Sequence, residues 1–247
     1  MKLTLFTDLD NTLIHSHRHK LDEPHSCVEL LNGKRQSFTL DSLVQYLNNQ
    51  DWLRIVPLTM RTPTQYKRLS TLVQSLQLRD ALICNGAILL NNFENNDKWE
   101  EESRRLVAPY LDKMIYLGES AAVRNLPFMF YIITDHPDET FTRMSKLAEG
   151  QLLLFKDSRK VFCLPASNNK GQAVKRFMYG NPGLSIAIGD SDPDISMLNE
   201  SDYAICPHSL YHCVNPRRRK YLCDLRSSSQ IISAFNSIKK EVFGCDR

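Results

Sequence analysis

The alternation of strand-like and helix-like segments is the feature that most constrains the fold of this 247-residue chain. Short apolar segments fit buried strands, whereas apolar residues three and four positions apart fit helices. The first part of the chain contains a strand at 2–6, a helix at 39–47, a strand at 53–60 and a helix that begins with a capping box of Thr62 and Gln65 and with Pro63. This order predicts βαβ units.

The same alternation returns after residue 170. A third predicted strand at 81–90 contains an Asn-Gly turn, and the later segments are a helix at 171–179, a strand at 184–189, a helix at 193–199, a strand at 203–206 and a helix near 229–242. Such alternation is typical of a parallel sheet with helices on both faces. The predicted fold class is therefore α/β, with a doubly wound parallel sheet.

Residues 88–165 break this pattern. They predict a helix at 99–117, a strand at 128–134, a helix at 137–148 and a hairpin that turns at 157–159. Helices and antiparallel strands inside a parallel fold indicate a second, smaller α+β domain. We expect a core domain of residues 1–87 and 166–247 and an inserted domain of residues 88–165.

The composition argues against several classes of protein. The chain has 31 basic and 28 acidic residues, and a net charge of +3 implies no nucleic-acid partner. The basic run at 217–220 is short and is typical of a solvated surface. No apolar run approaches the ~18 residues of a membrane span, and the scattered cysteines include no C-x-x-C pair. We expect a soluble, cytoplasmic protein with no membrane partner, and its oligomeric state stays open.

Two aspartates stand two positions apart behind the first strand, in the segment FTDLDNTL at 6–13. Residues i and i+2 of a strand project to the same face, so Asp8 and Asp10 would repel each other unless a positive group lies between them. A metal ion or a substrate proton would meet that need. The alternative is an acidic turn with Asn11 at its corner.

Ligands of open parallel sheets bind beyond the carboxyl ends of the strands. The polar residues that follow the predicted strands are Asp8, Asp10, Thr59, Arg61, Asn85, Asp190 and Asp194. Asp8 and Asp190 on neighbouring strands would form an oxygen site suited to Mg²⁺. Lys170, at the start of a helix, offers the compensating ammonium group.

The second acidic segment, GDSDPDISML at 189–198, does not fit a calcium loop. Its spacing places Ile195 where that loop needs glycine and Ser201 where it needs glutamate. Asp192 followed by Pro193 is typical of a helix cap. We therefore expect Asp192 to be structural.

Taken together, these motifs resemble the haloacid dehalogenase superfamily of aspartate-nucleophile phosphatases. DLDNT at 8–12 is similar to the first motif of that family, Thr59 in PLTMRT to the second, Lys170 to the third and GDSDPDISML to the fourth. The resemblance covers roughly the whole chain and implies a Rossmann-like core. The insertion, entered through CNGA at 84–87, resembles a small C2-type cap, as in sucrose-phosphate and trehalose-phosphate phosphatases, Cof-like hydrolases and phosphomannomutases.

The resemblance implies catalytic roles for two aspartates. Asp8 would attack phosphorus and form an aspartyl-phosphate. Asp10 would protonate the leaving alcohol and later deprotonate the attacking water. Mg²⁺ would be held by Asp8, Asp190 and the backbone carbonyl of Asp10.

The other motif residues would bind substrate or support the site. Thr59 and Lys170 would hold the phosphate oxygens, and Asp194 would orient Lys170 or a metal-bound water. Arg61 and Asn85 follow the second and third predicted strands and are expected to support the site.

Two departures from the family pattern bear on this resemblance. Pro193 occupies the place where the fourth motif commonly has asparagine, which removes a secondary hydrogen bond. The segment 14–38 is longer than expected and carries His15, His17, His19 and His25 before a predicted hairpin at Asn32-Gly33. The loose spacing of these histidines favours a solvated or substrate-gating loop over a transition-metal site.

The main functional hypothesis is a Mg²⁺-dependent phosphomonoesterase that acts on a small phosphorylated metabolite, with a sugar phosphate favoured. A phosphomutase of the phosphomannomutase type would use the same aspartates under a cationic cap, for which Arg143, Lys146, Arg159 and Lys160 are candidates. A non-catalytic binding protein on the same scaffold is the third hypothesis. The substrate and the cap residues that select it stay open.

Overall fold

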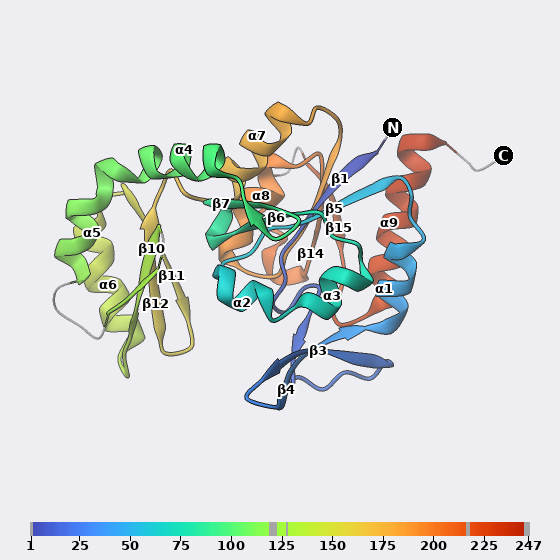
Figure 1. The fold of residues 1–247 in the computed structure, drawn as a ribbon, viewed down its shortest axis with the longest axis horizontal. Coiled ribbons are helices and arrows are strands. Elements are labelled where there is room, and N and C mark those ends of the chain that lie inside the picture. The colour runs from blue at the N-terminus through green and yellow to red at the C-terminus, as the bar shows by residue number, and fades with distance from the viewer. Residues whose placement is uncertain (1, 119–122, 127, 216–217, 245–247) are drawn as a thin grey trace.

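The centre of the molecule is a five-stranded sheet in which every neighbouring pair of strands is parallel. The computed structural model describes residues 2–118, 123–126, 128–215 and 218–244 (Figure 1). The strand order is β15 (Arg219–Leu222), β14 (Tyr203–Cys206), β13 (Ser185–Ile188), β1 (Leu3–Thr7) and β5 (Leu53–Pro57). The predicted doubly wound parallel sheet is confirmed.

Helices cover both faces of this sheet. α1 (Asp41–Asn48) and α9 (Ser228–Phe243) share one core cluster with Leu3 and Leu5 of β1. α7 (Lys170–Gly180) and α8 (Ile195–Glu200) share the other cluster with Phe6. Successive residues of a strand face opposite sides of the sheet, which explains why the first strand needs apolar residues on both faces. None of the helices in the described ranges has the length and apolar character needed to cross a membrane.

The strand predicted at 81–90 is divided at its Asn-Gly turn into two strands. These residues belong to two arms of a hairpin, β6 (Asp80–Ile83) and β7 (Ile88–Asn91), which form a separate antiparallel sheet with β8 (Glu94–Asn95). Cys84, Asn85 and Gly86 in the turn η1 (Cys84–Gly86) have φ angles of 50°, 61° and 93° and reverse the chain. An isolated parallel bridge between Leu58 and Leu82 places this hairpin beside the end of β5.

The basic run at 217–220, which the sequence indicated as a solvated surface, overlaps an edge strand. Arg219 and Lys220 begin β15, while Arg217 lies outside the described residues. Lys220 donates hydrogen bonds to the backbone carbonyls of Tyr211 and Val214. Charged side chains are common on edge strands because they discourage pairing with other chains.

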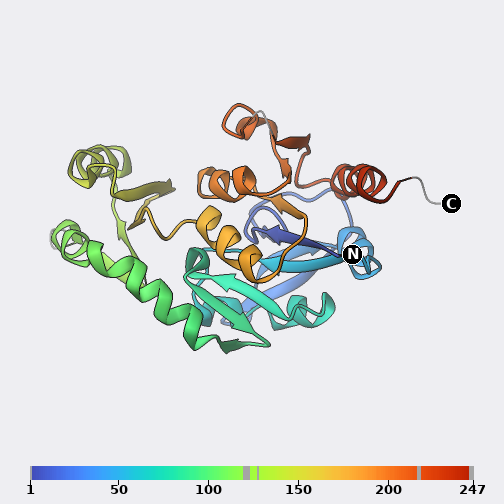
Figure 2. The same ribbon diagram turned by 90° about the horizontal axis from the view of Figure 1, so that it is seen from above.

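The inserted segment folds as an antiparallel sheet with helices on one face. Its elements are α4 (Asp97–Val107), η2 (Ala108–Tyr110), α5 (Leu111–Gly118), β9 (Val123–Leu126), β10 (Met129–Ile133), α6 (Pro137–Ala148), β11 (Leu152–Asp157) and β12 (Lys160–Pro165), with the sheet order β11-β12-β10-β9. α4 leads out from the core, and α5 and α6 cover the sheet face that points away from the core (Figure 1, Figure 2).

The predicted elements of this segment are largely confirmed. The helix expected at 99–117 is divided by η2, which contains Pro109, and the strand, the second helix and the hairpin lie where they were predicted. The division of the chain at 88–165 stays a prediction. The antiparallel sheet takes all its strands from residues after 122, whereas β7 and β8 pair with β6.

The segment between β1 and α1 forms a small sheet of its own (Figure 1). β2 (His15–Ser16), β3 (His25–Leu31) and β4 (Lys34–Leu40) pair in the order β2-β4-β3. Asn32 and Gly33 turn the chain with φ angles of 52° and 75°, which confirms the predicted hairpin. β3, β4 and their turn are called the flap hairpin below.

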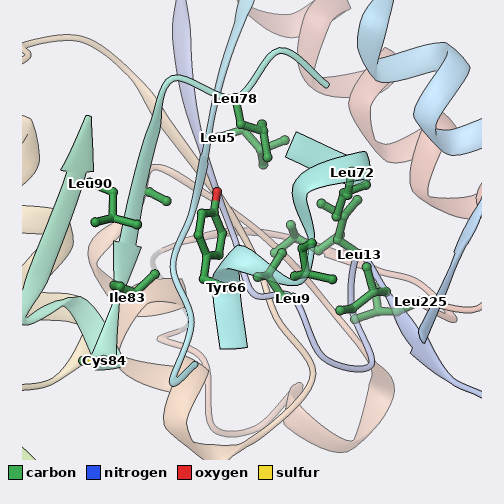
Figure 3. Packing of buried hydrophobic residues seen from close by; sticks show 14 of the residues in the cluster. Leu5, Leu9, Leu13, Tyr66, Leu72, Leu78, Ile83, Cys84, Leu90 and Leu225 are labelled. Carbon is green, nitrogen blue, oxygen red and sulfur yellow. The ribbon is translucent and has the colours of Figure 1, made fainter. Parts of the chain in front are cut away.

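Two further local features position the site. Thr62 and Gln65 form the predicted capping box at the start of α2 (Pro63–Lys67), which α3 (Ser70–Ser75) follows. Leu9 and Leu13, in the loop after β1, are buried in the larger core cluster (Figure 3). Burying a leucine side chain stabilises the fold by about 1.5–3 kcal/mol, so this loop is held firmly at the strand end.

Candidate active site

A buried lysine lies between two aspartates at the carboxyl end of β1. Lys170 Nζ donates hydrogen bonds of 2.6 Å to Asp8 Oδ1 and of 2.6 Å to Asp194 Oδ1. The exposed fraction is 1% for Lys170, 7% for Asp8 and 0% for Asp194. Charged groups at this depth require partners, because desolvation of an unpaired charge is costly. Three predicted residues from distant parts of the chain thus form one buried ionic group.

Close packing of α7 against α8 sets the position of Lys170, the first residue of α7. The Asn169 side chain caps this helix by accepting a hydrogen bond from the backbone of Gln172. A Cβ atom on Gly171 would lie 2.6 Å from the backbone oxygen of Ser196. Glycine therefore allows the two helices to approach this closely.

The loop after β13 turns Asp194 back toward the sheet. Asp194 Oδ2 accepts hydrogen bonds from the backbone N–H groups of Asp190 (3.0 Å) and Ser191 (3.1 Å) and from the Ser191 hydroxyl (3.1 Å). A Cβ atom on Gly189 would lie 2.5 Å from Asp194 Cβ, so this close approach requires glycine. The predicted cap at Asp192 is wrong, because Ser191 forms the capping box with Asp194 at the start of η3 (Asp192–Asp194).

The pKa values of this group reflect its burial and its excess of acidic over basic side chains. Burial raises the pKa of Asp8 well above its usual value, although Lys170 acts in the opposite direction. Burial and the charge of Asp194 raise the pKa of Asp190 to about 6. Burial would lower the pKa of Lys170, but the charges of Asp194 and Asp8 outweigh it and raise that pKa. Lys170 therefore stays charged, and one ammonium faces three carboxyl groups.

The donor atoms fit a hard divalent cation. One ligand oxygen from each of Asp8, Asp190 and Asp194 lies within 4.8 Å of the others, and the described residues contain no second group of this kind. Both oxygens of Asp194 already accept hydrogen bonds, so Asp8 and Asp190 are the better ligands. Thr12 Oγ1 donates to Asp190 Oδ1 over 3.2 Å and holds that carboxylate. Carboxylate oxygens with room for water suit Mg²⁺.

Asp10 has a cation of its own. Asp8 lies one residue beyond the end of β1, and Leu9 between the two aspartates is buried. The Asp10 side chain is 55% exposed and accepts hydrogen bonds of 2.8 Å from Arg61 Nε and 2.7 Å from Arg61 Nη2. Each carboxylate therefore has its own protein cation, Lys170 for Asp8 and Arg61 for Asp10. The predicted metal ion or proton between the two aspartates stays a prediction.

Thr59 follows β5 and Asn85 follows β6, and the two residues contact each other. Thr59 is 1% exposed, and its Oγ1 accepts a hydrogen bond of 3.2 Å from the backbone of Arg61. The backbone N–H of Asn85 donates to Thr59 O over 2.8 Å, and Asn85 Nδ2 donates to Asn168 O over 2.8 Å. Asn85 thus joins the turn after β6 to the chain that enters α7, two residues before Lys170.

The four histidines of the segment 14–38 do not form a metal-binding group among the described residues. His17, His19 and His25 are exposed, as a solvated loop predicts. His15 differs, because it is fully buried in β2. The expectation that this segment gates access of the substrate stays a prediction.

Sequence reasoning missed three residues of this region, Thr12, Ser191 and Glu29. Thr12 belongs to the DLDNT motif, so its place in that motif was an available signal. Glu29 is 3% exposed and accepts hydrogen bonds from Arg61 and Arg68. No local pattern could identify Glu29, because these partners are 32 and 39 residues away along the chain.

Solved structures of sugar phosphatases have this architecture. The sucrose-phosphatase from Synechocystis, solved with sucrose and phosphate, is 17% identical with a TM-score of 0.65, over 96% of this chain and 99% of that chain. A haloacid dehalogenase subclass IIB sugar phosphatase is 12% identical with a TM-score of 0.60, over 99% and 100% of the two chains. A haloacid dehalogenase-like hydrolase from Bacteroides thetaiotaomicron is 13% identical with a TM-score of 0.57, over 96% and 100%.

No family model and no curated protein matches the sequence. At 12–17% identity, the structural likeness establishes the fold and leaves the chemistry to be argued from the site. The five-stranded parallel sheet and the inserted α+β segment agree with that likeness. This chain therefore has the fold of the haloacid dehalogenase-like phosphatases.

Proposed function

We propose that this protein is a Mg²⁺-dependent phosphomonoesterase that hydrolyses a small phosphorylated metabolite, with sugar phosphates as the substrate class. The observation that carries the proposal is the contact of Lys170 with Asp8 and Asp194, next to Asp190, at the carboxyl end of β1. Ligands of open parallel sheets bind at this edge. The fold shared with solved sugar phosphatases supports the same assignment.

Asp8 is the proposed nucleophile. Its carboxylate oxygen attacks phosphorus, the bond from phosphorus to the leaving oxygen breaks, and an aspartyl-phosphate forms. In its protonated form, Asp10 gives a proton to the leaving oxygen, and the resulting carboxylate then takes a proton from the water that attacks the phosphorus atom. Release of inorganic phosphate returns both aspartates to their starting states.

The remaining site residues bind and orient the phosphoryl group in this proposal. Thr59 and Lys170 hold its oxygens, and Asp194 holds Lys170 in place through their 2.6 Å hydrogen bond. The carboxylates of Asp8 and Asp190 and the backbone carbonyl of Asp10 would hold Mg²⁺. When bound, the ion would draw charge from the transferring group.

The open face of the inserted sheet supports a sugar as the non-phosphate part of the substrate. Tyr131 and Phe162 are cross-strand partners with ring centroids 5.2 Å apart, and Lys160 Nζ lies 5.5 Å from the centroid of Tyr131. Lys156 contacts Phe141 of α6, so the alternation of the strands places the Tyr131 row on the face opposite the helices. That face points toward the core (Figure 2). Aromatic rings beside a cation suit a sugar ring with polar groups at its edge.

A phosphate-release assay across sugar, nucleotide and polyol phosphates tests the proposal. With Mg²⁺, we expect the wild-type protein to release phosphate from at least one sugar phosphate. EDTA should stop this release, and added Mg²⁺ should restore it. If no compound in the panel released phosphate, the non-catalytic binding protein would become the better hypothesis.

The placement of cap charges favours hydrolysis over the phosphomutase alternative. Arg143 and Lys146 lie on α6, on the outer face of the inserted sheet, and Arg159 pairs with Asp135 over 2.5 Å. Lys160 is the candidate that the alternation of strands puts on the open face. Among these four candidates, one lysine on that face offers little compensation to a second phosphate. Formation of a hexose 6-phosphate from the hexose 1-phosphate would instead establish the mutase.

The proposed setting is the cytoplasm, with a small phosphate ester as the partner rather than a nucleic acid or a membrane. The described cysteines are free thiols, and Cys84, Cys163, Cys206 and Cys223 are buried. Free thiols are typical of a reducing compartment. Fractionation of the native cell would test this location.

A further inference from the structure

A buried glutamate in the flap hairpin is surrounded by donors. Glu29 Oε1 accepts hydrogen bonds of 3.0 Å from Arg61 Nη1 and 2.8 Å from Arg68 Nε. Glu29 Oε2 accepts hydrogen bonds of 2.9 Å from Arg61 Nη2 and 2.6 Å from the Ser37 hydroxyl. Only 3% of Glu29 is exposed. A carboxylate in which each oxygen accepts two hydrogen bonds holds its partners in a fixed geometry.

The backbone of β3 is irregular at this residue. The pairing of β3 with β4 shifts register between Cys27 and Glu29 and again between Glu29 and Leu30. Val28 and Glu29 are therefore both buried, although neighbouring strand residues normally face opposite sides. A bulge of this kind re-aims a side chain, and such bulges are frequent beside active sites. Here the re-aimed side chain is the carboxylate that meets Arg61.

Arg61 carries this contact to the candidate acid and base. Its guanidinium donates two hydrogen bonds to Glu29 and two to Asp10, with Nη2 shared between the two carboxylates. The side chain of Arg61 is 10% exposed, whereas that of Asp10 is 55% exposed. The buried end of the chain of contacts is therefore Glu29, and the exposed end is Asp10.

Glu29 is ionised in the folded protein. Burial alone would raise its pKa, but hydrogen bonds from Arg61 and Ser37 and the charge of Arg61 lower that pKa to about 2. The charge of Glu29 therefore persists at neutral pH. Arg61 has a permanent anchor on the side away from Asp10.

We infer that Glu29 is a positioning residue for catalysis: through Arg61 it fixes the carboxyl group of Asp10 where it meets the leaving oxygen of the substrate. The inference rests on the proposed function, because it assigns to Asp10 the proton transfer described there. It makes the flap hairpin part of the catalytic apparatus, although no residue of that hairpin touches Asp8, Lys170 or Asp194 in a described hydrogen bond.

The consequence is a selective defect. A leaving group that is stable as an anion departs without a proton, whereas an alkoxide needs one from Asp10. Misplacing Asp10 should therefore slow the hydrolysis of a substrate with a poor leaving group and spare one with a good leaving group. Loss of the Lys170 site or of the fold would slow both substrates alike.

The experiment compares kcat/KM for benzyl phosphate and 4-nitrophenyl phosphate, which have an alkoxide and a stabilised phenolate as leaving groups. kcat/KM includes the departure of the leaving group and excludes the later attack of water. In Glu29→Gln, we expect kcat/KM to fall about 10- to 100-fold for benzyl phosphate and less than about 3-fold for 4-nitrophenyl phosphate. Arg61→Lys keeps the charge but removes the planar fork, so it should show the same selectivity.

Two variants act as controls. Glu23→Gln changes a glutamate in the same segment whose carboxylate accepts hydrogen bonds from the backbone and hydroxyl of Ser228, and it should leave both substrates unchanged. Arg68→Gln removes one donor to Glu29 and none to Asp10, so it should show the same selectivity with a smaller loss. Circular dichroism and thermal melting confirm folding of each variant.

The outcomes separate this inference from the proposed function. Equal losses on both substrates, or no loss on either, in folded Glu29→Gln and Arg61→Lys would overturn the positioning role while hydrolysis by the wild type still stood. A wild-type protein that cleaved neither substrate and none of the sugar phosphates would overturn both. A selective loss in the two variants, with Glu23→Gln unchanged, supports the role of Glu29.

Discussion

The two sides of the candidate site are built differently. On one side, Asp8 is 7% exposed and is held by Lys170, which is anchored in the packed helices α7 and α8. On the other side, the Asp10 side chain is 55% exposed and is held by Arg61, which the flap hairpin anchors through Glu29. The first side belongs to the core of the parallel sheet, and the second depends on an added hairpin.

This difference shows how two like side chains two residues apart acquire different surroundings. A buried carboxylate beside a fixed ammonium has one geometry and little contact with water, which suits attack on phosphorus. A half-exposed carboxylate can exchange protons with water between steps, which suits an acid and base. If this comparison is right, changes beside Asp8 and Lys170 should affect the covalent step, whereas changes in the flap hairpin should affect proton transfer by Asp10. The largest expected effect comes first.

Replacement of Asp8, the proposed nucleophile, should have the largest effect. Asp8→Asn should lower the rate of phosphate release by about 10⁴-fold or more, because an amide cannot form the aspartyl-phosphate. The control is Asp192→Asn, which changes an exposed aspartate at the start of η3. It should keep near-normal activity. Comparable losses of activity in both variants would contradict a specific role for Asp8 in catalysis.

Low pH should reduce the stability of the flap hairpin before that of the parallel sheet. His15 is buried in β2, which pairs with β4 of the hairpin. Burial, followed by the charges of His19 and Arg226, lowers the pKa of His15 to about 4, against the smaller effect of Asp224. An unfolded histidine titrates near 6.5, so the unfolded state binds more protons between these values and stability falls as the pH drops through that window. The linked loss reaches about 3 kcal/mol at pH 4.

Hydrogen exchange of the β3 and β4 amides at pH 5 and pH 7 would measure this effect. The amides of the flap hairpin should lose protection at pH 5 before those of β1 and β13. His15→Gln carries no titrating ring, so its difference between the two pH values should be smaller, whatever its own cost in stability. Equal pH dependence in the two proteins would assign the acid sensitivity to other groups.

A larger side chain at Gly189, next to Asp194, should reduce both the stability and the activity of the protein. Gly189→Ala would place a Cβ atom 2.5 Å from Asp194 Cβ and 2.7 Å from Met197 Cε. We expect a loss of about 1–3 kcal/mol in the free energy of unfolding, from urea titration, and a fall of about 10- to 100-fold in activity, because Asp194 and Lys170 must move. Gly180→Ala, where a Cβ atom meets nothing within 4 Å, should match the wild type in both measurements.

The smallest expected effect concerns the carboxylate of Asp190. Thr12→Val removes the hydroxyl that donates to Asp190 Oδ1, which should weaken Mg²⁺ binding by about 1 kcal/mol, or about 5-fold in the half-saturating Mg²⁺ concentration. Thr39→Val removes a buried hydroxyl bonded to Leu13 O, outside the site. If Thr39→Val raised the Mg²⁺ requirement as much as Thr12→Val did, the assignment of Thr12 would be wrong.

The sequence alone predicted the features that depend on neighbouring residues. The apolar run of β1, the capping box of Thr62 and Gln65 and the Asn32-Gly33 turn are local patterns, and the structure confirms each. The order of strands and helices also placed Asp8, Asp190 and Asp194 at one sheet edge, because carboxyl ends of parallel strands meet there.

Only the tertiary structure decided which charges meet. Asp10 pairs with Arg61 over 51 residues of chain, and Glu29 pairs with Arg61 over 32, so no local pattern links them. The turn at 84–86 shows the same limit, because an apolar run with Asn-Gly inside it fits a strand and a hairpin equally well until neighbouring strands choose between them. Periodicity fixes which face of a segment is buried, whereas packing between distant segments decides which side chains come into contact there.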